Sequence, residues 1–237
     1  MKCLKDLVEE KLSKDIDLID SILNKKDRVR EEAIRLSREI LRASAEAVRL
    51  IHLGLYDKAL SKVNEARDRV RLLKSLLNDH PDLFYSGLVY NCLSEFVEAV
   101  VVYSLIVDKT MPEFRELDVP YVPFLQGLGD SIGELRRHVI ELLRSEKYDE
   151  AGIYLDVMET IYQFLRKLNY PDALIPGIRH KVDVARRLIE DTKTLYLEIT
   201  INTKLYKKTT MLLNKLKTQT KENQINHPEK INNEPRP

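Results

Sequence analysis

Apolar residues recur three and four positions apart along almost the whole chain, and no stretch alternates with a period of two. This spacing places apolar side chains on one face of an α-helix, whereas a half-buried strand needs strict alternation. Only 7 glycines interrupt a composition rich in Leu, Ala, Glu, Lys and Arg, which are good helix formers. The sequence therefore predicts an all-α fold, an antiparallel bundle of about six to seven helices.

Prolines and turn residues divide the chain into segments of helical length. The expected helices cover about 25–53 (preceded by a helical segment over 4–23), 56–77, the stretch from the break at 78–81 to about 109, 121–144, 148–168, and 177 to beyond 197. We assign residues 1–200 to a single helical domain. Residues 201–237 form the end of the last helix and a basic, largely disordered tail, because KENQINHPEKINNEPRP has almost nothing to bury.

Charge and composition exclude several classes of protein. The tail from residue 201 has a net charge of +5 and the rest of the chain −4, so any nucleic-acid site must be local. No charge-free run of about 18 apolar residues indicates a membrane span, and the charged N-terminus does not look like a signal peptide. Cys3 and Cys92 suit a reducing compartment. We expect a soluble, cytoplasmic protein without a membrane partner.

Two pairs of carboxylates lie in otherwise apolar helices. Glu95 and Glu98 are the only charges between Cys92 and Val107, and their i, i+3 spacing puts them on one face. Asp130 and Glu134 share a face of the next long helix at i, i+4. Nearby stand three glycines, which a helix tolerates when another helix or a substrate comes close to the backbone: Gly127, Gly129 and Gly133.

These two helices are neighbours in sequence, so antiparallel packing is expected, with the two acidic faces meeting. Four converging carboxylates repel one another and raise their own pKa values. A hard divalent ion relieves this repulsion, and oxygen ligands select Mg²⁺, Mn²⁺ or Ca²⁺. Alternatively, Arg136, Arg137 or other basic residues neutralise the acids. The spacing alone leaves both interpretations open.

A row of arginines follows the first long helix. Arg28, Arg35, Arg42 and Arg49 repeat every seven residues, about 10.5 Å apart, and Arg38 lies on the same side. Guanidinium groups at this spacing can follow a phosphate backbone. The alternative is a solvated face on which the arginines pair with Glu31, Glu39 and Glu46.

These segments resemble the translin/Trax family, specifically its archaeal Trax-like branch, over about residues 25–200. The resemblance is carried by REEAIRLSREILRASAEAVRLIH, LSEFVEAV, LGDSIGEL and PGIRHKVDVARRLIEDTKTLYLEI. The acidic motifs are the most specific, because the catalytic Trax subunit carries Glu-x-x-Glu and Asp-x-x-x-Glu pairs, whereas translin lacks the full set. The loop between the helices of these two motifs is shorter than in eukaryotic Trax, and the Lys-rich tail has no counterpart in the family.

The resemblance implies a seven-helix bundle, Mg²⁺-dependent endoribonuclease activity (with Mn²⁺ as an alternative ion) and a hollow homo-oligomer that encloses RNA. It implies that Glu95, Glu98, Asp130 and Glu134 are the catalytic and metal-binding residues and that the first helix contacts RNA. The expected partners are single-stranded RNA or a short duplex, and also single-stranded DNA. The alternative function is a non-catalytic scaffold for single-stranded RNA or DNA, of the translin type.

Overall fold

A computed structural model describes residues 3–226, with side chains placed as far as residue 218. These residues form eight α-helices and a π-helical turn, and no strand occurs among them. The helices are α1 (Leu4–His52), α2 (Tyr56–Leu77), α3 (Pro81–Phe84), α4 (Gly87–Tyr103) with the π-turn η1 (Ser104–Asp108), α5 (Phe114–Leu117), α6 (Tyr121–Arg144), α7 (Tyr148–Arg166) and α8 (Ile178–Asn226). Six of these helices are long, and the predicted all-α bundle is confirmed.

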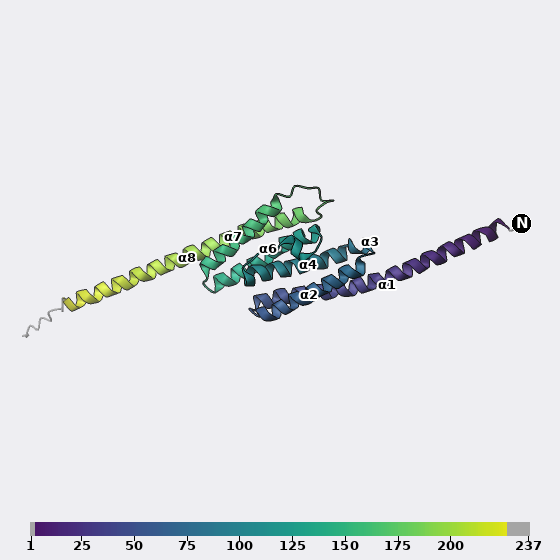
Figure 1. Ribbon diagram of the computed structural model, residues 1–237. Coiled ribbons are helices and arrows are strands. Elements are labelled where there is room, and N and C mark those ends of the chain that lie inside the picture. The colour runs from purple at the N-terminus through teal and green to yellow at the C-terminus, as the bar shows by residue number, and fades with distance from the viewer. Residues whose placement is uncertain (1–2, 227–237) are drawn as a thin grey trace, which may run out of the picture.

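The bundle is built around α4 and α6. Helices α1 and α2 form a hairpin that packs on α4, while α7 and α8 form a hairpin that packs on α6 (Figure 1). The side chains of Leu93, Phe96 and Val97 on α4 and of Ile132 and Leu135 on α6 are almost completely buried. Burial of apolar area on this scale is the main force that holds such a bundle together.

The segment Gly87–Asp108 is long and apolar enough to cross a membrane by length and composition alone. Within the bundle, 72% of its most apolar window is buried against other helices. A core helix surrounded by neighbours has the same composition, because it is apolar on every side.

Helices α4 and α6 run parallel, so the predicted antiparallel packing of this pair is wrong. Ser94 contacts Gln126, and further along both helices the charges of Glu98 and Asp130 interact. Residues 109–120 return along the bundle, with Lys109 bonded to Tyr154 near the start of α7. Twelve residues can extend up to roughly 40 Å, which is enough to return along a 22-residue helical segment of roughly 33 Å.

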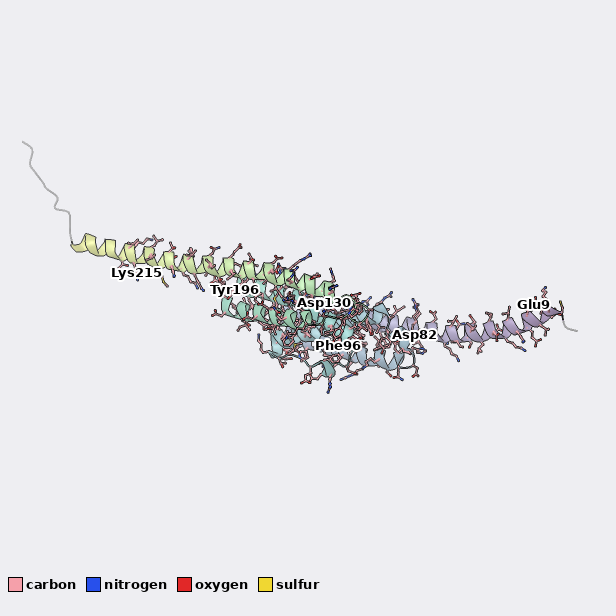
Figure 2. All side chains as sticks on the ribbon, turned by 90° about the horizontal axis from the view of Figure 1, so that it is seen from above. Glu9, Asp82, Phe96, Asp130, Tyr196 and Lys215 are labelled. Carbon is pink, nitrogen blue, oxygen red and sulfur yellow. The ribbon has the colours of Figure 1, made fainter. Side chains whose placement is uncertain are left out.

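Both terminal helices extend beyond the bundle. Helix α1 is continuous from Leu4 to His52, where two segments are expected from the sequence. Its N-terminal end and the C-terminal end of α8 project from opposite ends of the bundle (Figures 1 and 2). Helix α8 continues to Asn226, so the start of the predicted disordered stretch is helical. The remainder of that stretch, 227–237, lies outside the described residues.

Candidate functional site

The contact between α4 and α6 brings the two acid pairs to one place. Ser94 donates a hydrogen bond from its hydroxyl to the side-chain oxygen of Gln126 at 2.9 Å, which fixes the register of the two helices. One turn further along, all four carboxylates are half-buried. The charges of Glu95, Asp130 and Glu134 all act on Glu98. The structure therefore places the four predicted site residues in one electrostatic cluster, which we call the acidic site.

Two of the three glycines on α6 make the close contacts that the sequence predicts. A Cβ on Gly127 would lie 2.4 Å from the Ser94 carbonyl oxygen, so only glycine allows α4 to come this near. A Cβ on Gly129 would lie 3.2 Å from the Lys181 side chain, which crosses this position from α8. A Cβ on Gly133 would meet no described atom within 4 Å, so the surface between the two α6 acids stays open.

Asp130 and Glu134 on α6 each have a cationic or hydrogen-bonding partner from another helix. The Lys181 ammonium donates to Asp130 Oδ1 at 2.5 Å. The imidazole Nε2 of His52 lies 2.5 Å from Glu134 Oε2, and the His52 side chain is only 7% exposed. This hydrogen bond lowers the pKa of Glu134 below its ordinary value, so the carboxylate is ionised. Arg137 Nη1 adds a weaker ion pair to the same oxygen, at 3.9 Å.

The acids of α4 have no such partners. Among the described residues, neither Glu95 nor Glu98 has a hydrogen bond or an ion pair. Burial, followed by the charges of Glu95, Asp130 and Glu134, raises the pKa of Glu98 to about 8. The pKa of Glu95 is raised by burial and by the charge of Asp130, against the opposing effect of Lys181. A cation placed here would ionise both groups and relieve the repulsion.

The donor chemistry of the acidic site suits a hard divalent cation, because all four side chains offer carboxylate oxygens. The four carboxylates do not form a complete ligand shell, since no three Asp, Glu, His or Cys side chains within residues 3–226 converge closely enough to hold an ion. Lys181 and His52 occupy oxygens of Asp130 and Glu134. The neutralising basic residues expected as an alternative are therefore present on one pair, but come mainly from α8 and α1 rather than from Arg136 and Arg137.

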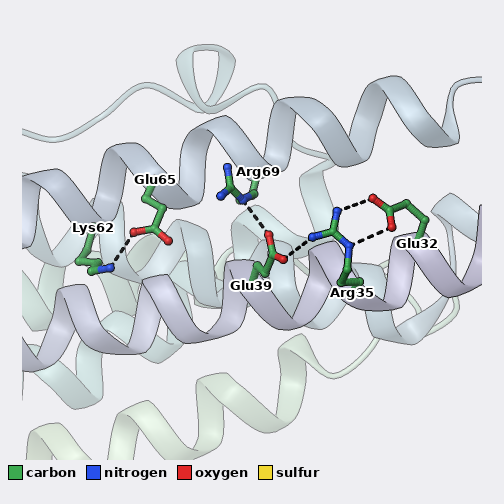
Figure 3. A network of polar contacts seen from close by, with 6 residues as sticks. All are labelled: Glu32, Arg35, Glu39, Lys62, Glu65 and Arg69. Carbon is green, nitrogen blue, oxygen red and sulfur yellow. Dashed lines mark hydrogen bonds and ion pairs between the residues drawn. The ribbon is translucent and has the colours of Figure 1, made fainter.

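Two members of the arginine row are paired with carboxylates on the same helix. Arg35 is held between Glu32 and Glu39, and Glu39 also accepts a hydrogen bond from Arg69 of α2 at 2.7 Å (Figure 3). Arg49 makes two hydrogen bonds of 2.7 Å to Glu46. For these two residues the predicted solvated face is what the structure shows.

The other three arginines of the row, Arg28, Arg38 and Arg42, are exposed and have no ion-pair partner among the described side chains. Glu31 pairs with Arg30, which lies outside the row. At 100° per residue, Arg38 points within about 40° of His52, which reaches the acidic site. Of the three, Arg38 therefore lies on the flank of α1 that carries His52, whereas Arg42 and Arg28 point about 80° and 120° away from it.

Sequence reasoning missed His52 and Lys181 as members of the site. They lie 82 and 51 residues from their partners, so no helical spacing links them to the acid pairs. One signal was available, because Gly129 beside Asp130 indicates that some group crosses the helix at that point.

The chain is similar to known proteins over most of its length. It is 35% identical over 180 residues to an uncharacterized protein of Methanocaldococcus jannaschii, a match that covers 75% of this chain and 79% of the relative. No family model matches.

Solved structures give a closer view of the fold. The AfC3PO complex with duplex RNA has a TM-score of 0.75 at 28% identity, covering 79% of this chain and 97% of that one. AfC3PO in a second crystal structure has a TM-score of 0.74 at 29% identity, covering 79% and 98%. Apo-NeC3PO has a TM-score of 0.71 at 21% identity, covering 78% and 96%, and this match supports the fold alone.

Proposed function

This chain belongs to the translin/Trax family, and on that basis we propose that it is an RNA-binding, Mg²⁺-dependent endoribonuclease that acts as a hollow homo-oligomer. The observation that carries the proposal is the acidic site, where Glu95 and Glu98 stand half-buried beside Asp130 and Glu134 with no hydrogen-bond or ion-pair partner among the described residues. Carboxylates in such surroundings are costly to the fold, and active sites are where proteins commonly retain them.

Glu95, Glu98, Asp130 and Glu134 would hold Mg²⁺, or Mn²⁺ in its place. Such an ion activates water and stabilises the charge that develops on a scissile phosphate. Without a cation the pKa of Glu98 is raised to about 8, and a bound divalent ion would lower it again, so that the carboxylate can coordinate the ion near neutral pH. His52 orients Glu134 through their hydrogen bond, and Lys181 carries a positive charge at the edge of the site, where it can attract a phosphate.

RNA is the proposed partner because one similar structure, that of AfC3PO, contains duplex RNA. In this chain the free arginines Arg28, Arg38 and Arg42 offer phosphate contacts along α1. Their contribution is local, which agrees with a protein whose total net charge is only +1. Binding of single-stranded RNA or single-stranded DNA stays a prediction from the sequence.

A second candidate function is a non-catalytic nucleic-acid scaffold. The observation that favours it is the occupation of Asp130 by Lys181 and of Glu134 by His52, together with the lack of a convergent ligand shell among the described residues. In that case the acids serve the fold and the arginines alone meet the nucleic acid. The two functions differ in whether a divalent ion leads to cleavage of the RNA or affects only the binding of the RNA.

The deciding experiment incubates the purified protein with short single-stranded and duplex RNA, with Mg²⁺ or with EDTA. Asp130→Asn removes the charge without changing the shape of the side chain, and Glu141→Gln is a matched control on the exposed face of α6. The endoribonuclease predicts cleavage that needs Mg²⁺, is lost in Asp130→Asn and persists in Glu141→Gln. RNA binding without cleavage under any condition would establish the scaffold.

A further inference from the structure

The two projecting helix ends expose apolar side chains that the bundle does not cover. The α1 extension, residues 4–24, is exposed at every residue. The α8 extension, residues 197–218, is exposed at every residue from Lys204 onward. Most helical stability in proteins comes from packing of an apolar face, and contiguous exposed apolar surface commonly marks an interface. Each extension therefore presents an apolar surface that no described part of the chain covers.

The apolar stripes of the two extensions have the same spacing. Leu4, Val8, Leu12 and Ile19 in α1 and Leu197, Ile201, Leu205 and Leu212 in α8 are each separated by four, four and seven residues. All of these side chains are exposed. At 100° per residue each set lies within an arc of about 80°, which is narrow enough to form the seam of a two-helix coiled coil.

In the long gap of each stripe one charged residue lies on the same face as the apolar side chains, and these two charges are opposite. Asp15 occupies the gap in α1, and Lys208 occupies the corresponding position in α8. Both are exposed, and neither has an ion-pair partner among the described residues. With the helices parallel and the two stripes in register, Asp15 comes opposite Lys208, whereas an antiparallel pair would place Asp15 against Ile201 and Lys208 against Val8. A single polar pair within an apolar seam is a known means of fixing register.

The charge of the whole extensions is complementary as well. The α1 extension carries six acidic residues and three lysines, whereas the α8 extension carries five lysines and one acidic residue. Like helices would therefore repel each other, while α1 and α8 extensions attract.

The two extensions of one molecule point away from each other from opposite ends of the bundle, so they cannot pair within one copy (Figures 1 and 2).

We propose that the α1 extension of one copy packs against the α8 extension of a second copy, with Asp15 opposite Lys208. Pairing of this kind buries both apolar stripes and neutralises the opposed charges. It does not depend on RNA cleavage, because neither extension contains a residue of the acidic site.

Disulfide trapping tests the contact directly in the full-length protein. The exposed Cys3 is first replaced by Ser, and Cys92 stays because it is buried. Copies carrying Asp15→Cys are mixed with tagged copies carrying Lys208→Cys and oxidised. The matched control, Asp17→Cys mixed with Thr210→Cys, uses positions two residues further along on the opposite faces. We expect the mixed disulfide to form at least tenfold faster for the test pair; equal rates, or dimers of like copies only, would overturn the pairing.

Charge exchange provides a second readout by sedimentation velocity. Asp15→Lys and Lys208→Asp should each weaken assembly, and the double variant Asp15→Lys/Lys208→Asp should restore it. Thermal melting of each variant shows that the bundle remains folded, as expected for exposed positions. A double variant no better than the singles would contradict the contact. Unchanged sedimentation of Lys208→Asp with lower RNA affinity would assign the α8 extension to nucleic-acid binding instead.

Discussion

The acid pair of α4 and the acid pair of α6 look alike in sequence but differ in their surroundings. Both lie on one face of an apolar helix, three or four residues apart. Asp130 and Glu134 each receive a partner from a distant helix, whereas Glu95 and Glu98 receive none among the described residues. The pKa of Glu134 is accordingly lowered and that of Glu98 raised.

This difference shows that spacing on a helix determines where a carboxylate points but not its protonation state. The α6 pair is stabilised by the fold itself. The α4 pair can be ionised at little cost only when a cation is bound, so it is the part of the site whose protonation state a cation would change the most.

Glu98→Gln should give the largest effect, because it removes one of the two carboxylates that have no partner. We expect cleavage of RNA to fall by about 100-fold or more, as for loss of a metal ligand. The melting temperature should not fall, since the glutamine leaves no buried charge. Single-turnover cleavage and thermal melting measure the two quantities. Wild-type cleavage by the variant would show that Glu98 is not required.

The same contrast between paired and free charges divides the arginine row. Arg38→Ala/Arg42→Ala removes two free guanidinium groups, and Arg35→Ala/Arg49→Ala removes two paired ones. The first variant should lower RNA affinity by about tenfold and flatten the slope of log affinity against log salt by roughly two, because phosphate contacts release counterions. The second should have a smaller effect. Equal effects of the two variants would mean that Arg35 and Arg49 leave their glutamate partners and contact RNA.

Lys181→Met tests whether the charge on α8 competes with a divalent ion. Removing the ammonium frees Asp130, so Mn²⁺ should bind several-fold more tightly, by roughly 1 kcal/mol. Isothermal titration with Mn²⁺ measures this without relying on activity. Lys193→Met, which breaks an exposed ion pair with Glu159 on the neighbouring helix α7, is the control. Weaker binding in Lys181→Met would show that the lysine supports the site instead.

The dependence of stability on pH should differ in sign between the two pairs. Because the pKa of Glu98 is raised to about 8 in the folded protein, the protonated side chain contributes fully to stability below about pH 4.5. This contribution is lost as the pH rises through about 8. The lowered pKa of Glu134 has the opposite consequence, stability that is present above about pH 4.5 and lost in acid. In EDTA, Glu98→Gln should therefore gain a few degrees in melting temperature between pH 5 and 8, and Glu134→Gln should lose a few at neutral pH. Parallel curves for the two variants would contradict this.

The sequence predicts those features of the site that depend on a single helix. Phase along a helix places Glu95 with Glu98 and Asp130 with Glu134, and the i, i+3 rule anticipates the bond from Arg49 to Glu46. It also anticipates the close contact at Gly127.

Features that depend on how helices are connected in space could not be predicted in this way. The direction of α6 relative to α4 is set by the path of residues 109–120, for which the sequence shows no period. The partners His52 and Lys181 come from the first and the last helix of the chain, and local spacing carries no information about such contacts.

The position of the acidic site at the meeting point of α1, α4, α6 and α8 has a consequence for the order of folding. The α1–α2 and α7–α8 hairpins join neighbouring segments and close early, whereas the bond between His52 and Glu134 spans 82 residues. We therefore expect the site to be completed last, after both hairpins have docked on the central helices. Loosening of either hairpin would therefore disrupt the site before the rest of the core unfolds. During synthesis, the site with all its partners can form only after the ribosome has passed Lys181.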